Sequence, residues 1–176
     1  MFVLALLINF VSMLEYKDYM LHFGLLAVGK VKDKSLMTLI NQYQKMLSPY
    51  GLVSVFELKP EKFSESNQIQ AQRLEQFKID DFIENLQKKE NWTPILLTET
   101  GKRYNSVDLA KWLSTLEGKP LFILGGALGF DYSFKSKHKT QLSLSDLTFT
   151  HEMARLVLFE QLYRVTTILN NKNYHY

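Results

Sequence analysis

Cysteine is absent from the 176-residue chain, which excludes disulfide bonds, thiolate metal sites and a cysteine nucleophile. Histidine is scarce as well. The four histidines are His22, His138, His151 and His175, and no two of them stand at the spacing of metal ligands. We therefore expect no structural metal and no thiol chemistry in this protein.

A hydrophobic run long enough to cross a membrane is also missing. The apolar stretch over residues 1–11 is well short of the ~20 residues that a transmembrane helix requires. Its hydrophobicity is compatible with an export signal, but it has no positively charged start and no small-residue cleavage site. We favour an N-terminal extension, residues 1–19, ahead of a start at Met20 and a single domain over residues 20–176. On that interpretation the protein is cytoplasmic and has no membrane partner.

Charge of either sign is present in ordinary amounts, with 22% charged and 46% hydrophobic residues. This composition excludes a disordered chain, a collagen-like fibre and a coiled-coil rod. The net charge of +3 lies entirely within residues 119–176, because residues 1–118 carry equal numbers of acidic and basic side chains. A basic final third is compatible with a polyanionic partner without requiring one.

Short apolar runs alternate with helical patterns along the chain. Strands are predicted at 21–28, 52–58, 94–98, 120–124 and 141–144, and helices at 35–47, 66–89, 106–116 and 150–169. This alternation indicates an α/β protein with a mostly parallel sheet flanked by helices. The polar stretch 59–67 is expected to be a mobile loop.

The last predicted helix is apolar around most of its circumference. Thr150 suits the N-cap and Glu152 the first turn, while Glu160 and Arg164 are spaced to form an ion pair. A helix of this kind is covered on more than one side. A chain of this length has few layers for that purpose, so a second copy of the chain is a natural cover.

Two glycine turns follow predicted strands, at Gly101 and at the G-G-x-x-G sequence Gly125–Gly129. Glycine allows the backbone to approach a ligand closely or to adopt positive φ. The spacing is neither G-x-G-x-x-G nor that of a phosphate-binding P-loop, which argues against a nucleotide-dependent oxidoreductase. Because ligands of open α/β sheets bind at the carboxyl ends of strands, both turns are candidates for a binding site.

The C-terminal third carries a specific set of motifs. Residues 142–155 read L-S-x-S-x-x-T-F-x-H-x-x-x-R, and a Tyr-His pair, Tyr174 and His175, stands near the end. With the glycine loop and the opening strand Leu25-Leu-Ala-Val-Gly-Lys-Val-Lys32, these motifs closely resemble the ribosomal RNA large subunit methyltransferase H family. The resemblance runs from about Leu21 to the C-terminus.

This resemblance implies the SPOUT class of methyltransferases, with an α/β trefoil-knot fold and a homodimeric state. It implies an enzyme that uses S-adenosyl-L-methionine to methylate N3 of a pseudouridine in 23S rRNA of the assembled ribosome. The cofactor-binding positions carried over are Leu97, Gly125, Gly126, Leu144, Ser145, Asp146, Leu147, Thr148 and Phe149.

The same resemblance, with the chemistry of the side chains, selects residues for catalysis and RNA binding. His175 is the expected catalytic base, since histidine suits proton transfer at neutral pH. His151, Arg155, Tyr174 and His175 are the expected RNA contacts, and the basic cluster over residues 135–139 is a further candidate. The family usually ends in Arg or Lys where this chain has Tyr176. That departure leaves open an alternative, a non-catalytic knotted dimer that binds RNA or a ribosomal face.

Overall fold

Five parallel strands form one sheet in the order β2-β1-β4-β3-β5 in the computed structural model, which describes residues 21–174. The expected extension 1–19 and His175 lie outside the described residues. The elements in chain order are β1 (Leu21–Val28), α2 (Lys34–Leu47), β2 (Gly51–Leu58), α3 (Gln68–Gln87), β3 (Trp92–Lys102), α4 (Ser106–Ser114), β4 (Lys119–Leu124), α5 (Tyr132–Lys137), β5 (Gln141–Leu142) and α6 (His151–Leu169).

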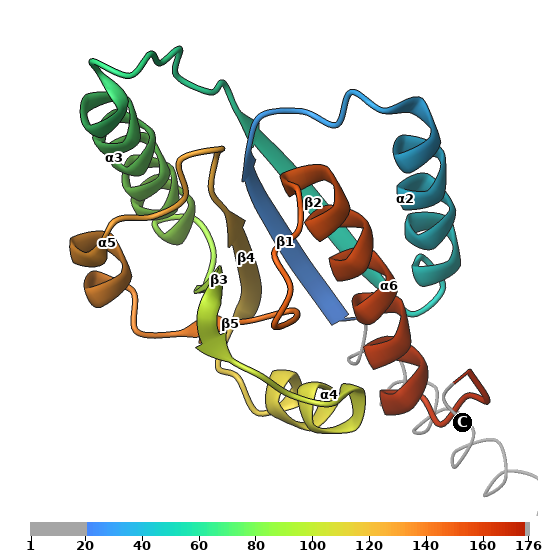
Figure 1. Cartoon of the computed structure of the whole chain (residues 1–176). Helices are drawn as coiled ribbons and strands as arrows, with labels where there is room; N and C mark the ends of the chain where they lie inside the picture. The colour runs from blue at the N-terminus through green and yellow to red at the C-terminus, as the bar shows by residue number, and fades with distance from the viewer. Residues whose placement is uncertain (1–20, 175–176) are drawn as a thin grey trace, which may run out of the picture.

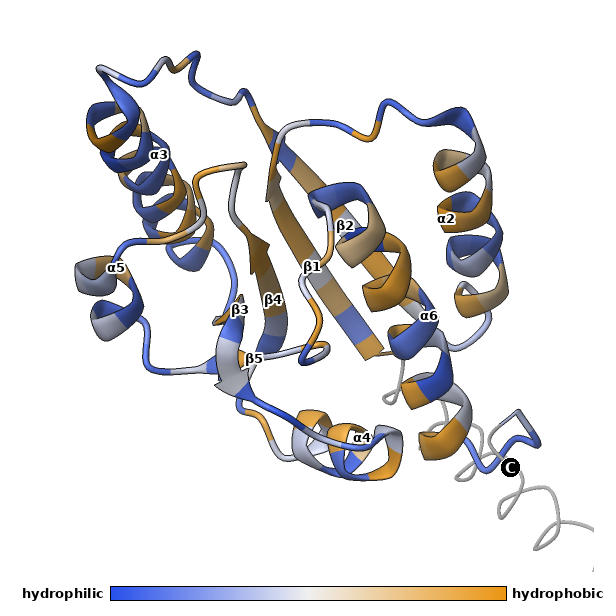
Figure 2. Cartoon of the chain, in the orientation of Figure 1, coloured by the Kyte–Doolittle hydropathy of each residue, from blue (hydrophilic) through white to orange (hydrophobic). Residues whose placement is uncertain are grey.

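Helices cover both faces of the sheet (Figure 1). Helices α2, α4 and α6 lie on one face, and α3 and α5 lie on the other. Successive strand residues point to opposite faces, so Phe23 and Leu25 of β1 join the first layer while Leu26 joins the second. Because both faces are buried, β1 and β4 are almost continuously hydrophobic, as Figure 2 shows. The predicted parallel sheet flanked by helices is confirmed.

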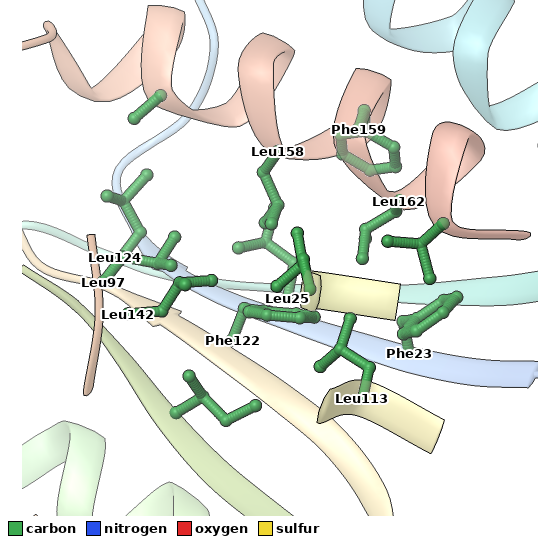
Figure 3. Close-up of a cluster of buried hydrophobic side chains, with 14 of the residues drawn as sticks. Phe23, Leu25, Leu97, Leu113, Phe122, Leu124, Leu142, Leu158, Phe159 and Leu162 are labelled. Atoms are coloured by element: carbon green, nitrogen blue, oxygen red, sulfur yellow. The ribbon is translucent and has the colours of Figure 1, made fainter. Parts of the chain in front are cut away.

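Helix α6 supplies the largest part of the core on its face (Figure 3). Leu158, Phe159 and Leu162 point onto the sheet, where they face Leu25 and Phe122 of the two central strands. All five side chains are at most 1% exposed. Burying each of them stabilises the fold by about 1.5–3 kcal/mol before the cost of ordering is counted. The position of α6 on the sheet is therefore strongly determined.

Side-chain caps fix where four helices begin. Asp33, Asn105, Asp131 and Thr150 each accept a hydrogen bond from a backbone N–H in the first turn of the helix that follows. These bonds satisfy N–H groups that have no partner within the helix. The predicted N-cap at Thr150 and the acidic first-turn residue Glu152 are both confirmed.

Strand β3 and helix α5 differ from the prediction. Strand β3 continues to Lys102, so Gly101 lies within the strand and not in a turn. A Cβ at Gly101 would come within 2.5 Å of the Leu142 carbonyl carbon, so glycine is required by the close approach of β5. Helix α5, which Asp131 caps, was not predicted; it contains residues 135–137 of the basic cluster.

Candidate functional site

A cavity of about 680 Å³ opens at the carboxyl ends of β3 and β4. Two loops form most of its wall: residues 125–130 after β4 and residues 143–150 between β5 and α6. The first turns of α2 and α6 close the remaining side. The volume lies within the range of ordinary small-molecule sites, and the location is that of ligands in open α/β sheets.

Most of the residues predicted to bind the cofactor meet in this cavity. Its lining includes Leu97, Gly125, Gly126, Leu144, Ser145, Leu147, Thr148 and Phe149. Asp146 is the exception, because its exposed carboxylate forms an ion pair with Arg103 outside the cavity. The structure thus brings together side chains from three separate segments, while their role in binding stays a prediction.

Sequence reasoning missed the wall contributed by α2 and α6. Asp33 and Leu36 of the first, and Glu152 and Ala154 of the second, also line the cavity. The available signal was topological: β1 is paired with β4, so the chain that leaves β1 emerges at the same edge of the sheet as the glycine loop.

The loop over residues 143–150 is held by its own polar groups. The Ser143 hydroxyl donates to the Ser145 carbonyl at 2.9 Å, and the Ser145 hydroxyl accepts from the Leu147 N–H at 2.9 Å. The Ser143 N–H donates to the Lys102 carbonyl at 3.0 Å, which ties the loop to the end of β3. These bonds fix the loop that carries Leu144, Leu147 and Phe149 of the cavity lining.

Helix α3 holds the glycine loop from the other face of the sheet. The Gln72 side-chain amide donates to the Leu128 carbonyl at 2.7 Å. Glu75 lies against Gly126, where a Cβ would collide with its carboxylate, and accepts from the Glu61 N–H at 2.9 Å. Burial raises the pKa of Glu75 above its ordinary value. These supports were not visible in the sequence, because a polar helix face gives no sign of what it contacts.

The basic cluster over residues 135–139 is largely neutralised within the chain. Lys135 pairs with Glu99 at 2.9 Å, and its hydrogen bond lowers the pKa of that carboxyl. Lys137 and His138 both contact Asp80, at 2.7 and 2.8 Å. Such engaged charges are poorly placed to attract RNA.

His151 and Arg155 were predicted to share an RNA-binding face, and the structure places them differently. His151 lines the cavity. The Arg155 side chain is only 2% exposed; it pairs with Glu57 at 2.6 Å and donates to the Gly29 carbonyl. The prediction of a surface phosphate contact from Arg155 is therefore wrong: a buried guanidinium joins α6 to the ends of β1 and β2.

Tyr174 lies away from the cavity. Its ring packs edge-on against Tyr163 and under the Arg164 guanidinium, and its hydroxyl lies 3.4 Å from the Glu160 carboxylate. Burial raises the pKa of Tyr174 to about 12. Glu160, whose predicted ion pair with Arg164 is confirmed, lies about 14 Å along the helix axis from His151. Within one chain, Tyr174 and the cavity are therefore well separated.

Neither a metal site nor a membrane span is found in the described part of the chain. Residues 21–174 contain no group of three or more potential metal ligands. None of the helices in this range is long and apolar enough to cross a bilayer.

Comparison with known proteins decides the family. A family model described as "Predicted SPOUT methyltransferase" matches residues 21–175. The chain belongs to the SPOUT methyltransferase family. It is 35% identical to the ribosomal RNA large subunit methyltransferase H of Acetivibrio thermocellus, over 86% of this chain and 97% of the relative. It is 37% identical to that of Kosmotoga olearia, over 84% and 95% respectively. A probable methylase family protein from Haemophilus influenzae has a similar fold, with a TM-score of 0.52 at 13% identity, over 88% of this chain and 70% of that one.

Methyltransferases of the SPOUT family use S-adenosylmethionine, and the cavity has a volume and an apolar lining that fit a small molecule of this kind. Leu97, Leu144 and Phe149 line the cavity and would offer apolar walls to the adenine ring of a bound cofactor. When bound, the cofactor supplies an electrophilic methyl group. The contribution of the chain is to hold that group at a fixed position at the edge of the sheet.

We expect Leu147→Ala to weaken S-adenosylmethionine binding roughly fivefold to tenfold, because the removed side chain lines the cavity and a bound cofactor would bury it. Leu147 is 74% exposed, so the fold itself should keep its stability. Leu52→Ala, at an exposed position outside the cavity, is the matched control. Titration calorimetry that gave both variants the wild-type affinity would remove Leu147 from the binding site.

We expect Arg155→Met to lower the free energy of unfolding by about 3 kcal/mol, because Glu57 and the Gly29 carbonyl lose a buried partner. Arg103→Met is the control, since its ion pair with Asp146 is solvent-exposed and contributes less than about 1 kcal/mol. Urea unfolding compares the two variants. Equal losses would show that Arg155 does not clamp α6.

Proposed function

We propose that this protein methylates N3 of a pseudouridine in 23S rRNA on the assembled ribosome, in the cytoplasm, with S-adenosylmethionine as the methyl donor. The observation that carries the proposal is the convergence of residues from three distant segments on one cavity at the carboxyl edge of the sheet. The names of the curated relatives, ribosomal RNA large subunit methyltransferase H, supply the substrate class. The proposal includes the trefoil-knot threading that the family resemblance implies.

The proposed reaction requires a proton acceptor next to the cavity, because N3 of pseudouridine must lose its proton as the methyl group arrives. The carboxylates that line the described cavity are already engaged. Asp33 caps α2, Glu99 pairs with Lys135, and Glu152 accepts from two backbone N–H groups. Because His151 also lines the cavity, the choice of His175 as the acceptor rests on the family resemblance. Positioning of the nucleophile makes the larger contribution to the rate.

The proposed active form is a homodimer, in which the C-terminal residues of one protomer serve the cavity of its partner. Helix α6 leaves Leu156, Tyr163, Ile168 and Leu169 only half-buried, as expected for a helix that a second subunit covers. Tyr174, the residue before His175, packs beside Glu160 and not at the cavity of its own chain. The position of Tyr174 supports the proposal that His175 serves the cavity of a neighbouring subunit.

The first test is methyl transfer from labelled S-adenosylmethionine to assembled ribosomes that lack the modification. We expect label on N3 of one pseudouridine, located by mass spectrometry of the 23S rRNA. Ribosomes that already carry the modification are the control. Cofactor binding without label would contradict the proposed substrate. Neither binding nor label would favour a non-catalytic dimer that binds RNA.

The second test asks which subunit supplies the base. Heterodimers are isolated, by two affinity tags, from a His175→Ala protomer and a Gly125→Trp protomer whose cavity is blocked. If the C-terminus acts across the interface, the heterodimer keeps one complete site and about half of the wild-type rate, while each homodimeric variant is inactive. An inactive heterodimer would mean that His175 acts within its own chain, and an active His175→Ala homodimer would mean that His175 has no catalytic role.

A further inference from the structure

Three lysines, Lys30, Lys32 and Lys34, stand in the segment between β1 and α2, beside the mouth of the cavity. All three are exposed, and within residues 21–174 none of them forms an ion pair. Asp33, in the same segment, lines the cavity itself. The segment thus places a group of unneutralised positive charges next to the candidate site.

The backbone that carries these lysines is fixed from the first turn of α6. Glu152 accepts hydrogen bonds from the N–H groups of Lys32 and Asp33, both at 3.0 Å. The buried Arg155 donates to the Gly29 carbonyl, and the Gly29 N–H donates to the Leu58 carbonyl at 2.8 Å. A mobile tail of lysines would lose conformational entropy on binding, whereas here the backbone is already ordered.

Side chains of this segment divide between the core and solvent. Val31 packs against the core on the α6 face of the sheet, whereas Lys30 and Lys32 are exposed to solvent. Lys34, the first residue of α2, is exposed as well.

Nearby acidic groups offset part of this charge without forming an ion pair with the three lysines. Asp33 is occupied as the N-cap of α2, with bonds of 2.7 and 3.0 Å from the N–H groups of Ser35 and Leu36. Glu152 is occupied by the two N–H groups of the segment, which lower the pKa of its carboxyl. Other cations around the cavity are paired: Lys135 with Glu99, and Arg103 with Asp146.

We propose that Lys30, Lys32 and Lys34 bind the phosphodiester backbone of the RNA next to the nucleotide that enters the cavity. Contacts of this kind fix the position of a nucleic acid without reading its sequence, and they are strongly salt-dependent. The proposal deepens the proposed function and rests on it for the identity of the polyanion. The two are separable by experiment, since RNA binding and methyl transfer are measured independently.

The test compares two triple variants with the same change in net charge. In the first, Lys30, Lys32 and Lys34 are changed to Gln. In the second, Lys45, Lys88 and Lys89 are changed to Gln; these exposed lysines lie near the C-terminal ends of α2 and α3, at the opposite edge of the sheet. Binding of a fluorescent RNA stem-loop is followed by anisotropy between 50 and 200 mM salt, roughly the range over which phosphate contacts dominate the change in affinity.

We expect the first variant to bind the RNA at least tenfold more weakly at low salt, with the slope of log K against log[salt] reduced by about two. The second variant should retain the wild-type slope, and both should bind S-adenosylmethionine as the wild type does. Equal losses of RNA affinity in the two variants would show that only the net charge of the protein matters, and would overturn the proposal. An unchanged first variant, or a wild-type protein that binds no RNA at low salt, would overturn it as well.

The same proteins separate this proposal from the proposed function. A wild type that binds the stem-loop through the three lysines but transfers no methyl group to ribosomes would contradict the proposed reaction and leave the lysine site standing. Methyl transfer at the wild-type rate and KM by the first variant would support the reaction and reject the site.

Discussion

The buried guanidinium of Arg155 is the contact on which the arrangement of the site depends. It joins α6 to Glu57 at the end of β2 and to the Gly29 carbonyl just after β1. One helical turn earlier, Glu152 holds the segment that leads into α2. The first turn of α6 is thereby fixed to two neighbouring strand ends, and its residues form one wall of the cavity. Leu158, Phe159 and Leu162 extend this attachment along the sheet (Figure 3).

The opposite wall depends on a different set of bonds. Gln72 and Glu75 reach the glycine loop from α3, across the carboxyl edge of the sheet. The cavity thus lies between the segment that leads into α2, which α6 supports, and the glycine loop, which α3 supports from the opposite face of the sheet. A site built this way can hold a small molecule rigidly, which supplies the positioning that a displacement at an activated methyl group needs. The proton acceptor of the proposed reaction is a separate requirement.

How far the sequence predicts this structure depends on the range of the interactions involved. The strands and the N-cap at Thr150 were predictable, because strand alternation and helix capping involve residues close in sequence. The continuation of β3 past Gly101 was not, since it requires a backbone contact with Leu142. The prediction that Arg155 lies on the surface was wrong for the same reason. Its partner Glu57 stands nearly a hundred positions earlier in the sequence, so the residues around Arg155 give no sign of the ion pair. The cavity residues were located through resemblance to a family, and their convergence required the fold.

Under the proposed function, the two ends of α6 have different roles. The first turn, through His151 and Glu152, belongs to the cavity that holds the cofactor. The later turns, around Glu160 and Arg164, hold Tyr174 and with it the start of the C-terminal residues. Cofactor binding should then be a property of each subunit, while methyl transfer requires two subunits, so a monomeric form would bind S-adenosylmethionine without using it. Coupling catalysis to assembly in this way confines methyl transfer to the state in which the RNA and the base are both present.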